Sequence, residues 1–168
     1  VLDRQEDKIF LISKKALATR PYNDDLTAIT WENCTLRKWL NEEFFNTAFG
    51  AAEQACIHRT DVKAGKNPRF GTDPGEDTVD RVFLLSIEEA GKYFGRDKER
   101  ACIATDAAIN DGAVVMKDKS CWWWLRSPDY DSYLTADVSS GGSVFLHGND
   151  VDSDDYAVRP ALWLNLKS

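Results

Sequence analysis

Three consecutive tryptophans, Trp122, Trp123 and Trp124, impose the strongest constraint on how this chain can fold. They lie in the apolar segment CWWWLRSP (residues 121–128), which has the composition of a β-strand. Neighbouring side chains of a strand point to opposite faces, so successive bulky rings need cover on both faces. A second apolar segment, AVRPALWLNL (residues 157–166), supplies another tryptophan. We therefore expect two strands that share one core, with the first covered on both sides.

The size and charge of the chain indicate one acidic domain. It has 168 residues, 43% of them hydrophobic, which is enough for an ordinary core in a single domain over residues 1–168. Its 28 acidic and 21 basic residues give a net charge of −7. This charge argues against nucleic acid or an anionic membrane as the main partner. No apolar run approaches the roughly 20 residues of a membrane span, so we expect no direct membrane insertion.

Four widely spaced cysteines, Cys34, Cys56, Cys102 and Cys121, include no close CxxC pair. Structural zinc sites usually bring their ligands in such pairs, so we expect no zinc site. Four cysteines allow three disulfide pairings, and the sequence does not choose among them. We favour buried, unpaired thiols that act as small apolar side chains.

Capping signals and hydrophobic periodicity predict helices mainly in the first two thirds of the chain. Asn33 is a candidate N-cap for a helix that runs to about Asn46 with one apolar face. Ser86 begins a capping box and opens a helix expected to end at Gly95. Weaker helical character covers residues 99–109. Strands are expected over residues 8–13, 79–85 and several short segments after residue 113. This order favours an α+β fold over a parallel sheet.

Catalytic and metal-binding motifs are scarce. The two histidines, His58 and His147, stand in no nucleophile or metal-binding pattern, and the common hydrolase and nucleotide-binding motifs are absent. The aspartates of residues 150–155 resemble the start of a calcium loop but lack its glycine and final glutamate. An acidic surface loop is the favoured interpretation, with a weak calcium site as the alternative. We expect no catalytic residue, no metal and no cofactor.

Residues 129–157 differ in composition from the rest of the chain. They contain no Lys, Arg, Glu, Gln, Met or Trp, although Lys, Glu, Gln, Met and Trp make up 29 of the 139 residues outside them. The segment instead holds seven aspartates together with Tyr, Ser, Gly, Asn and His. Antibody-like binding loops use Tyr, Ser, Gly and Asn, because rigid rings supply area and small polar groups adapt. Glycine-rich turns would not explain aromatic residues on turns, so we expect a contact surface here.

At the two apolar segments the sequence resembles a bacterial family of unknown-function domains. The resemblance rests on WWWLRSP (122–128) followed by VRPALWLNL (158–166), and it extends to TLRKWLNEEFF (35–45) and DRVFLLSIEEAGKYF (80–94). It implies an α+β, C-type lectin-like fold in which two main helices pack on short, mostly antiparallel strands, related to the formylglycine-generating enzyme. It also implies similarity to the variable proteins of diversity-generating retroelements. In those systems a mutagenic reverse transcriptase randomises adenines, and the mutated AAC-type codons cannot encode Lys, Glu, Gln, Met or Trp.

The resemblance implies a set of variable, ligand-facing positions between the two apolar segments. These positions are Asp129, Tyr130, Asp131, Ser132, Tyr133, Leu134, Phe145, Leu146, His147, Asn149, Asp152, Ser153 and Tyr156. Fixed scaffold positions between them are Ala136, Val138, Val144, Gly148 and Val151. The chain departs from the family at Asp129 and Ala157, where glycine is usual. The catalytic cysteines of the related enzyme have no counterparts here.

Together these features predict a non-enzymatic, ligand-binding domain of the receptor or adhesin type. Its expected partner is a protein or another macromolecule on a cell, phage or host surface, and the resemblance favours a location at the cell surface or outside the cell. The seven aspartates of residues 129–157 favour a basic patch on that partner. The alternatives are a calcium-dependent carbohydrate-binding lectin, an enzyme of the formylglycine-generating type, and a structural module of a larger surface protein.

Overall fold

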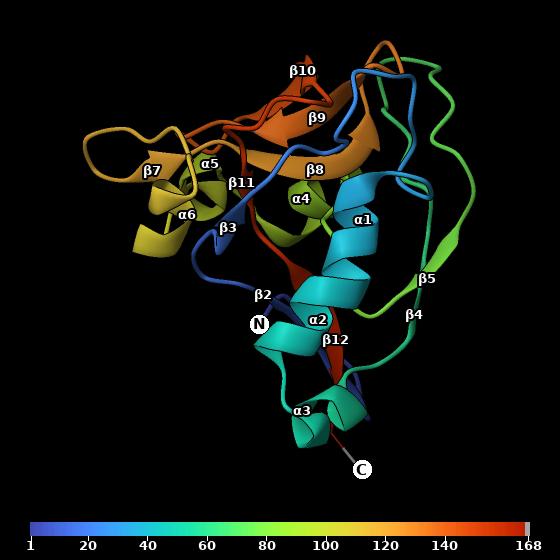
Figure 1. Ribbon diagram of the computed structural model, residues 1–168. Coiled ribbons are helices and arrows are strands. Elements are labelled where there is room, and N and C mark those ends of the chain that lie inside the picture. The colour runs from blue at the N-terminus through green and yellow to red at the C-terminus, as the bar shows by residue number, and fades with distance from the viewer. Residues whose placement is uncertain (167–168) are drawn as a thin grey trace.

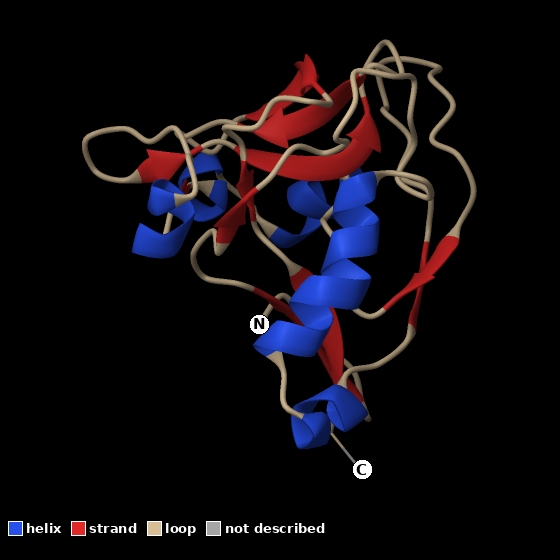
Figure 2. Cartoon of the chain, viewed as in Figure 1, coloured by secondary structure: helices blue, strands red, loops and turns tan. Residues whose placement is uncertain are grey.

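The computed structural model describes residues 1–166 and contains many short elements (Figure 1). The strands are β1 (Asp3–Arg4), β2 (Lys8–Ile12), β3 (Ala18–Thr19), β4 (Thr60–Val62), β5 (Thr78–Asp80), β6 (Cys102–Ile103), β7 (Ser120–Cys121), β8 (Trp123–Pro128), β9 (Leu134–Val138), β10 (Val144–Asp150), β11 (Ala157–Val158) and β12 (Ala161–Asn165). The helices are α1 (Thr35–Trp39), the π-helical η1 (Leu40–Phe44), α2 (Phe45–Ala48), α3 (Ala51–Cys56), α4 (Ile87–Tyr93), α5 (Asp97–Arg100) and α6 (Asp106–Asn110). Figure 2 shows that long loops connect these elements.

Two sheets carry most of the strand pairing. The larger has five strands in the order β10-β9-β8-β11-β3, and the smaller has three in the order β1-β2-β12. Strands β8, β9 and β10 are antiparallel neighbours, whereas β11 runs parallel to β8. The end of the chain, red in Figure 1, passes from β11 into β12 and so joins the two sheets. Two further pairs are β4-β5 and β6-β7.

The predicted fold class is wrong. Helices hold 22% of the residues and strands 30%, so the fold is β-rich rather than the predicted C-type lectin-like arrangement of two main helices packed on strands. The expected helix over residues 33–46 is divided by the π-helical η1, and the stretch 99–109 is divided into α5 and α6 by β6. There Cys102 pairs with Cys121, and this long-range pairing overrides a weak helical propensity. Within residues 1–166, no helix has the length and apolar character needed to cross a membrane.

Local signals for helix starts are more reliable than the predicted helix lengths. The Glu89 N–H donates to Ser86 Oγ at 3.1 Å and the Ser86 N–H donates to Glu89 Oε2 at 2.9 Å, which completes the predicted capping box of α4. At α1 the N-cap is Cys34 rather than Asn33, and its sulfur accepts from the Arg37 N–H at 3.4 Å. Capping groups are neighbours in sequence, whereas helix length depends on distant packing partners.

Trp123 and Trp124 confirm the two-sided cover expected for the first apolar strand, because both are fully buried. Trp123 lies 5.1 Å from the guanidinium of Arg159, measured from the ring centre, and donates its indole N–H to the Arg100 carbonyl at 3.2 Å. Trp124, on the opposite face, stacks on Tyr156 with ring centres 4.1 Å apart. The pattern of the sequence therefore located β8, the middle strand of the five-stranded sheet.

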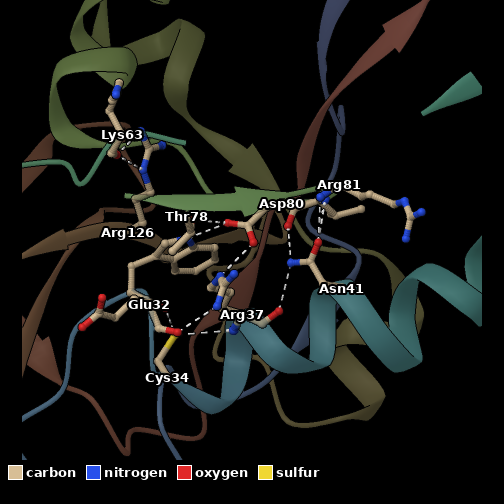
Figure 3. A network of polar contacts seen from close by, with 11 residues as sticks. Glu32, Cys34, Arg37, Asn41, Lys63, Thr78, Asp80, Arg81 and Arg126 are labelled. Atoms are coloured by element: carbon tan, nitrogen blue, oxygen red, sulfur yellow. Dashed lines mark hydrogen bonds and ion pairs between the residues drawn. The ribbon is translucent and has the colours of Figure 1, made fainter. Parts of the chain in front are cut away.

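A buried carboxylate ties α1 to β5 (Figure 3). Asp80 accepts hydrogen bonds from the Thr78 hydroxyl at 2.6 Å, the Arg37 guanidinium at 2.7 Å and the Trp31 indole at 3.0 Å. A buried charge is tolerated when it is paired and hydrogen-bonded in this way. Asp80 is therefore a structural residue whose carboxylate is held by three donors of the protein itself.

Arg126, embedded in the apolar strand β8, has a structural role. Its buried guanidinium donates to the carbonyl oxygens of Lys63 at 3.2 Å and Leu84 at 2.6 Å, and it pairs with Glu89. Figure 3 shows the contact with Lys63. These bonds fix the beginning of the 63–77 loop beside β8, which brings that loop to the candidate site.

Candidate ligand-binding surface

The candidate surface is formed by β8, β9, β10 and the loops that join them. In the register of these strands, Asp137 of β9 lies opposite Trp124 on one side and Phe145 on the other. Residues 129–133 connect β8 to β9, and residues 151–156 lead from β10 to β11. Short connections join the antiparallel neighbours β8, β9 and β10, and residues 151–156 then cross the sheet to β11 (Figure 1). The segment with the unusual composition is therefore one continuous region of the molecule.

The structure places all but one of the predicted ligand-facing residues at the surface. Exposed are Tyr130, Asp131, Tyr133, Phe145, His147 and Asp152, while Ser132, Leu134, Leu146, Asn149, Ser153 and Tyr156 are partly buried. The exception is Asp129, whose side chain is fully buried. Its carboxylate accepts from the backbone N–H of Tyr130. The prediction for Asp129 is corrected, since this side chain holds the turn instead of facing a ligand.

The predicted scaffold positions lie beneath this surface. Ala136, Val138 and Val151 are fully buried, and Val144 is half-buried. At Gly148 a Cβ atom would lie 1.6 Å from the backbone oxygen of Thr135, so only glycine lets β10 approach β9 this closely. Exposed and less exposed positions therefore alternate along β10, whereas β9 is buried from Thr135 to Val138.

One group of aromatic residues, named here the tip cluster, consists of Phe70, Tyr130 and His147. The ring centre of Phe70 lies 5.1 Å from that of His147 and 5.8 Å from that of Tyr130, and the latter two are 6.0 Å apart. These distances suit edge-to-face aromatic contacts. Tyr130 nevertheless remains 56% exposed. The tip cluster is thus an open aromatic surface at one end of the sheet.

Sequence reasoning missed Phe70, which comes from the 63–77 loop. The buried side-chain amide of Asn67 holds this loop in place by donating to the Pro128 carbonyl at 3.1 Å and the Leu146 carbonyl at 3.2 Å. Asn67 also accepts from the Arg69 N–H at 3.0 Å, which shapes the turn before Phe70. A single asparagine in a loop rich in glycine and proline gives no sequence pattern that would reveal these long-range bonds.

Residues 23–31 add a further loop to the same end of the sheet. The Ile29 N–H donates to the Ser132 carbonyl at 3.0 Å, and the Val151 N–H donates to the Tyr133 carbonyl at 3.0 Å. Figure 1 shows the blue, green and orange loops gathered there. A hollow of about 400 Å³ lies between these loops, bordered by Ile29, Thr72 and Ser132. The exposed tip therefore combines a projecting aromatic group with an adjacent recess.

A second group, named here the sheet cluster, consists of Trp122, Trp124, Phe145 and Tyr156. Trp122 meets Phe145 at 5.0 Å and Tyr156 at 6.2 Å between ring centres, in edge-to-face geometry. Tyr156 is stacked at 4.1 Å on the fully buried Trp124. The sheet cluster is thus partly a surface and partly the outer layer of the core.

Two buried carboxyl groups lie beneath the candidate surface. Asp129 and Asp137 each have one carboxyl oxygen without a hydrogen-bond partner in the described part of the chain. Burial raises the pKa of Asp137 to about 7, and the charge of Asp129 adds to this, while contact with the Tyr156 hydroxyl opposes it. Burial also raises the pKa of Asp129, against the hydrogen bond from the Tyr130 backbone. The base of the surface therefore carries carboxyls that protonate readily.

The aspartates of residues 150–155 do not gather into a metal-binding group. Asp150, Asp152 and Asp154 are exposed and Asp155 is half-buried. Across residues 1–166, no three Cys, His, Asp or Glu side chains are arranged to hold a metal ion. The acidic residues of this loop instead contribute negative charge to the edge of the surface.

A protein family matches the chain over nearly its whole length. The family is described as a domain of unknown function (DUF6273), and its model matches residues 6–166. No curated protein and no solved structure matches the chain. The similarity to retroelement variable proteins and to the formylglycine-generating enzyme has no counterpart among these findings. The chain therefore belongs to the DUF6273 family.

Proposed function

We propose that this protein is a non-enzymatic ligand-binding domain whose surface over residues 129–156 can change in sequence without loss of the fold. One observation carries the proposal. The segment that lacks Lys, Glu, Gln, Met and Trp is also the segment whose side chains contribute most of the tip cluster and the exposed part of the sheet cluster. Exposed side chains add little packing energy, so replacing them costs little stability.

The residue types in this segment support diversification by a retroelement of the diversity-generating kind. Adenine-directed mutation of AAC-type codons yields Tyr, His, Phe, Asp and Ser, which are the types found at Tyr130, His147 and Phe145 and around them. The rings that these residues contact include Phe70 and Trp122, which lie outside the segment. Because Phe70 and Trp122 would stay unchanged, new side chains at the variable positions could pack against a constant ring.

The chemistry of the surface favours a macromolecular partner with a basic patch, on a cell, phage or host surface. Tyrosine rings give large, rigid contact area with a polar end, as in many protein interfaces. Exposed Asp131 and Asp152 lie in the same segment as five further aspartates. Opposite charge on the partner would speed association, and added salt would slow it. We propose the same cell-surface or extracellular location that the resemblance implies.

Two matched libraries test whether the surface is variable. In the first, Tyr130, Tyr133, His147 and Asp152 are replaced with mixtures encoded by mutated AAC codons. In the second, the same mixtures replace Ala136, Val138, Gly148 and Val151. We expect most members of the first library to keep a melting temperature close to the parent's and most of the second to unfold. Equal loss of folding in the two libraries, measured by protease resistance, would overturn the proposal.

The encoding DNA gives a second, independent test. A nearby imperfect repeat of codons 120–160 that differs only where the repeat has adenine would support diversification directly. The absence of such a repeat from the genome would remove the diversification mechanism, while the library result would still decide whether the surface tolerates change.

A further inference from the structure

The register of β6 and β7 places two cysteines directly opposite each other. Cys102 pairs with Cys121 and Ile103 with Ser120, and the ladder continues with the Ala104 N–H bonded to the Lys119 carbonyl at 2.9 Å. Directly opposed residues of antiparallel strands have Cα atoms about 4.5–5.5 Å apart and side chains on the same face. A disulfide spans Cα separations of about 4.4–6.8 Å. The backbone alone therefore sets these cysteines at bonding distance.

The two cysteines are buried and lie opposite each other on paired strands. The Cys121 thiol also contacts the Cys102 carbonyl, with the sulfur 3.4 Å from the oxygen. A hydrogen bond from the Cys121 thiol lowers the pKa of Cys102, and the nearby charge of Arg159 adds to the effect. The same hydrogen bond and burial raise the pKa of Cys121. The pair is therefore asymmetric, with the thiolate favoured at Cys102.

Arg159 is a buried cation without an acidic partner. Its guanidinium donates to the Ser13 carbonyl at 2.9 Å and the Arg100 carbonyl at 3.0 Å, and among residues 1–166 it forms no ion pair. Arg126, equally buried, pairs with Glu89. An unpaired buried charge is costly, so a thiolate beside Arg159 would relieve that cost. The surroundings of the cysteine pair thus favour a negative sulfur.

We propose that Cys102 and Cys121 are a disulfide-forming pair in which Cys102 is the attacking thiol and the oxidant is a small-molecule disulfide such as oxidised glutathione. The Cys102 thiolate attacks one sulfur of the small disulfide and releases its other half as a thiolate. Cys121 then loses its proton and attacks the Cys102 sulfur, which releases the second small thiolate. Two protein thiols are oxidised, and one small disulfide is reduced to two thiols.

This bond would link β6 to the residue that precedes Trp122 and β8, and so would anchor the strand at the centre of the candidate surface. Because both sulfurs are buried, exchange in the folded protein requires β6 and β7 to separate, and we expect it to be faster during refolding. Disulfides persist in oxidising surroundings, which a cell-surface protein meets. The inference stands on the strand register and does not depend on the proposed binding function.

Refolding in a glutathione redox buffer tests the proposal. The four thiols are then counted by alkylation in denaturant, and the linked peptides are mapped by mass spectrometry. We expect two alkylated thiols, at Cys34 and Cys56, and a bond between Cys102 and Cys121, and Cys34→Ser should retain that bond. Four alkylated thiols, or a bond between any other two cysteines, would overturn the proposal.

Two single variants, folded first and then incubated with oxidised glutathione without denaturant, test the order of attack. Cys121→Ser should accumulate glutathione on Cys102 as a mixed disulfide, because the resolving thiol is missing. Cys102→Ser should leave Cys121 largely unmodified under the same conditions, because its thiolate is disfavoured. Equal labelling of the two variants, or none in either, would remove the assignment of Cys102 as the attacking thiol.

Discussion

The tip cluster and the sheet cluster are both aromatic, but they rest on different supports. Tyr130 in the tip cluster is 56% exposed, and its ring contacts those of Phe70 and His147, which are themselves near the surface. Tyr156 in the sheet cluster stacks on Trp124, which is completely buried. The composition of residues 129–157 marks both tyrosines in the same way. The composition therefore identifies a surface. The residues packed beneath each tyrosine determine how much stability is lost when that tyrosine is replaced.

The largest loss of stability is expected at Gly148, a fixed position between the variable positions His147 and Asn149. Gly148→Ala would place a Cβ atom 1.6 Å from the Thr135 backbone oxygen, so β10 would have to move away from β9. Such overpacking against backbone should cost about 3 kcal/mol or more of the free energy of unfolding. Urea denaturation followed by tryptophan fluorescence measures this loss, because Trp124 of the sheet cluster lies on β8, which pairs with β9.

Gly141→Ala is the matched control for that variant. The nearest atom to a Cβ there is the Ser139 hydroxyl oxygen at 3.9 Å, and the position is exposed. We expect a change within about 0.5 kcal/mol. A Gly148→Ala protein as stable as the Gly141→Ala protein would show that β10 is not held against β9, and the distinction between fixed and variable positions on this strand would fail.

A smaller, pH-dependent effect is expected at the base of the sheet cluster. Burial raises the pKa of Asp137 to about 7 in the folded state, and the unfolded value is near 3.9. Between these values the folded state binds more protons, so this group's contribution to stability falls as pH rises from about 4 to about 7. Asp137→Asn should therefore gain about 2 to 3 kcal/mol over the parent protein above pH 7 and little at pH 4.

Chemical denaturation of the two proteins at a series of pH values measures this difference. Asp131→Asn is the control, because its side chain is exposed in the loop before β9 and should change stability by less than about 0.5 kcal/mol. If the free energies of unfolding of Asp137→Asn and the parent differ by the same amount at every pH, Asp137 is ionised and solvated in the folded protein. Water would then reach the base of the sheet cluster.

The sequence predicts features that depend on neighbours in the chain. Trp123 and Trp124 identify a strand buried on both faces, because side-chain alternation follows directly from strand geometry. Ser86 identifies the start of α4, because its capping partner is three residues away. The boundary of the surface segment is likewise visible in composition alone. Each of these signals comes from residues close together in the sequence, and the folded structure contains the corresponding feature.

Features that depend on distant partners were missed or mistaken. Asn67 reaches carbonyls in two remote strands, and so Phe70 joins the surface without any sequence signal. Asp129 has the polarity of a surface residue, yet the turn it supports buries it. The fold class was wrong for a similar reason. Strand pairing such as that of Cys102 with Cys121 divided a stretch expected to be helical, and sequence pattern does not record which strands pair.

Two tyrosine variants distinguish the support of the tip cluster from that of the sheet cluster. Tyr156→Ala removes a ring stacked on Trp124 and should cost about 1.5 to 2 kcal/mol. Tyr130→Ala removes a largely exposed ring and should cost less than about 0.5 kcal/mol. Equilibrium unfolding in urea at one pH resolves such a difference. The conservative Tyr156→Phe keeps the stacked ring and should retain most of the stability.

Two outcomes would contradict this ranking in different ways. Small losses in both alanine variants would mean that the support beneath Tyr156 contributes nothing, so every position of the segment could vary freely. Large losses in both would mean that Tyr130 is part of the core, and the tip cluster could not serve as a changeable surface. If Tyr156→Ala costs more stability than Tyr130→Ala, a diversified surface must keep residues such as Tyr156 for the fold even where the codon permits change. Stacking of Tyr156 on Trp124 stabilises the strands that carry the freely variable positions.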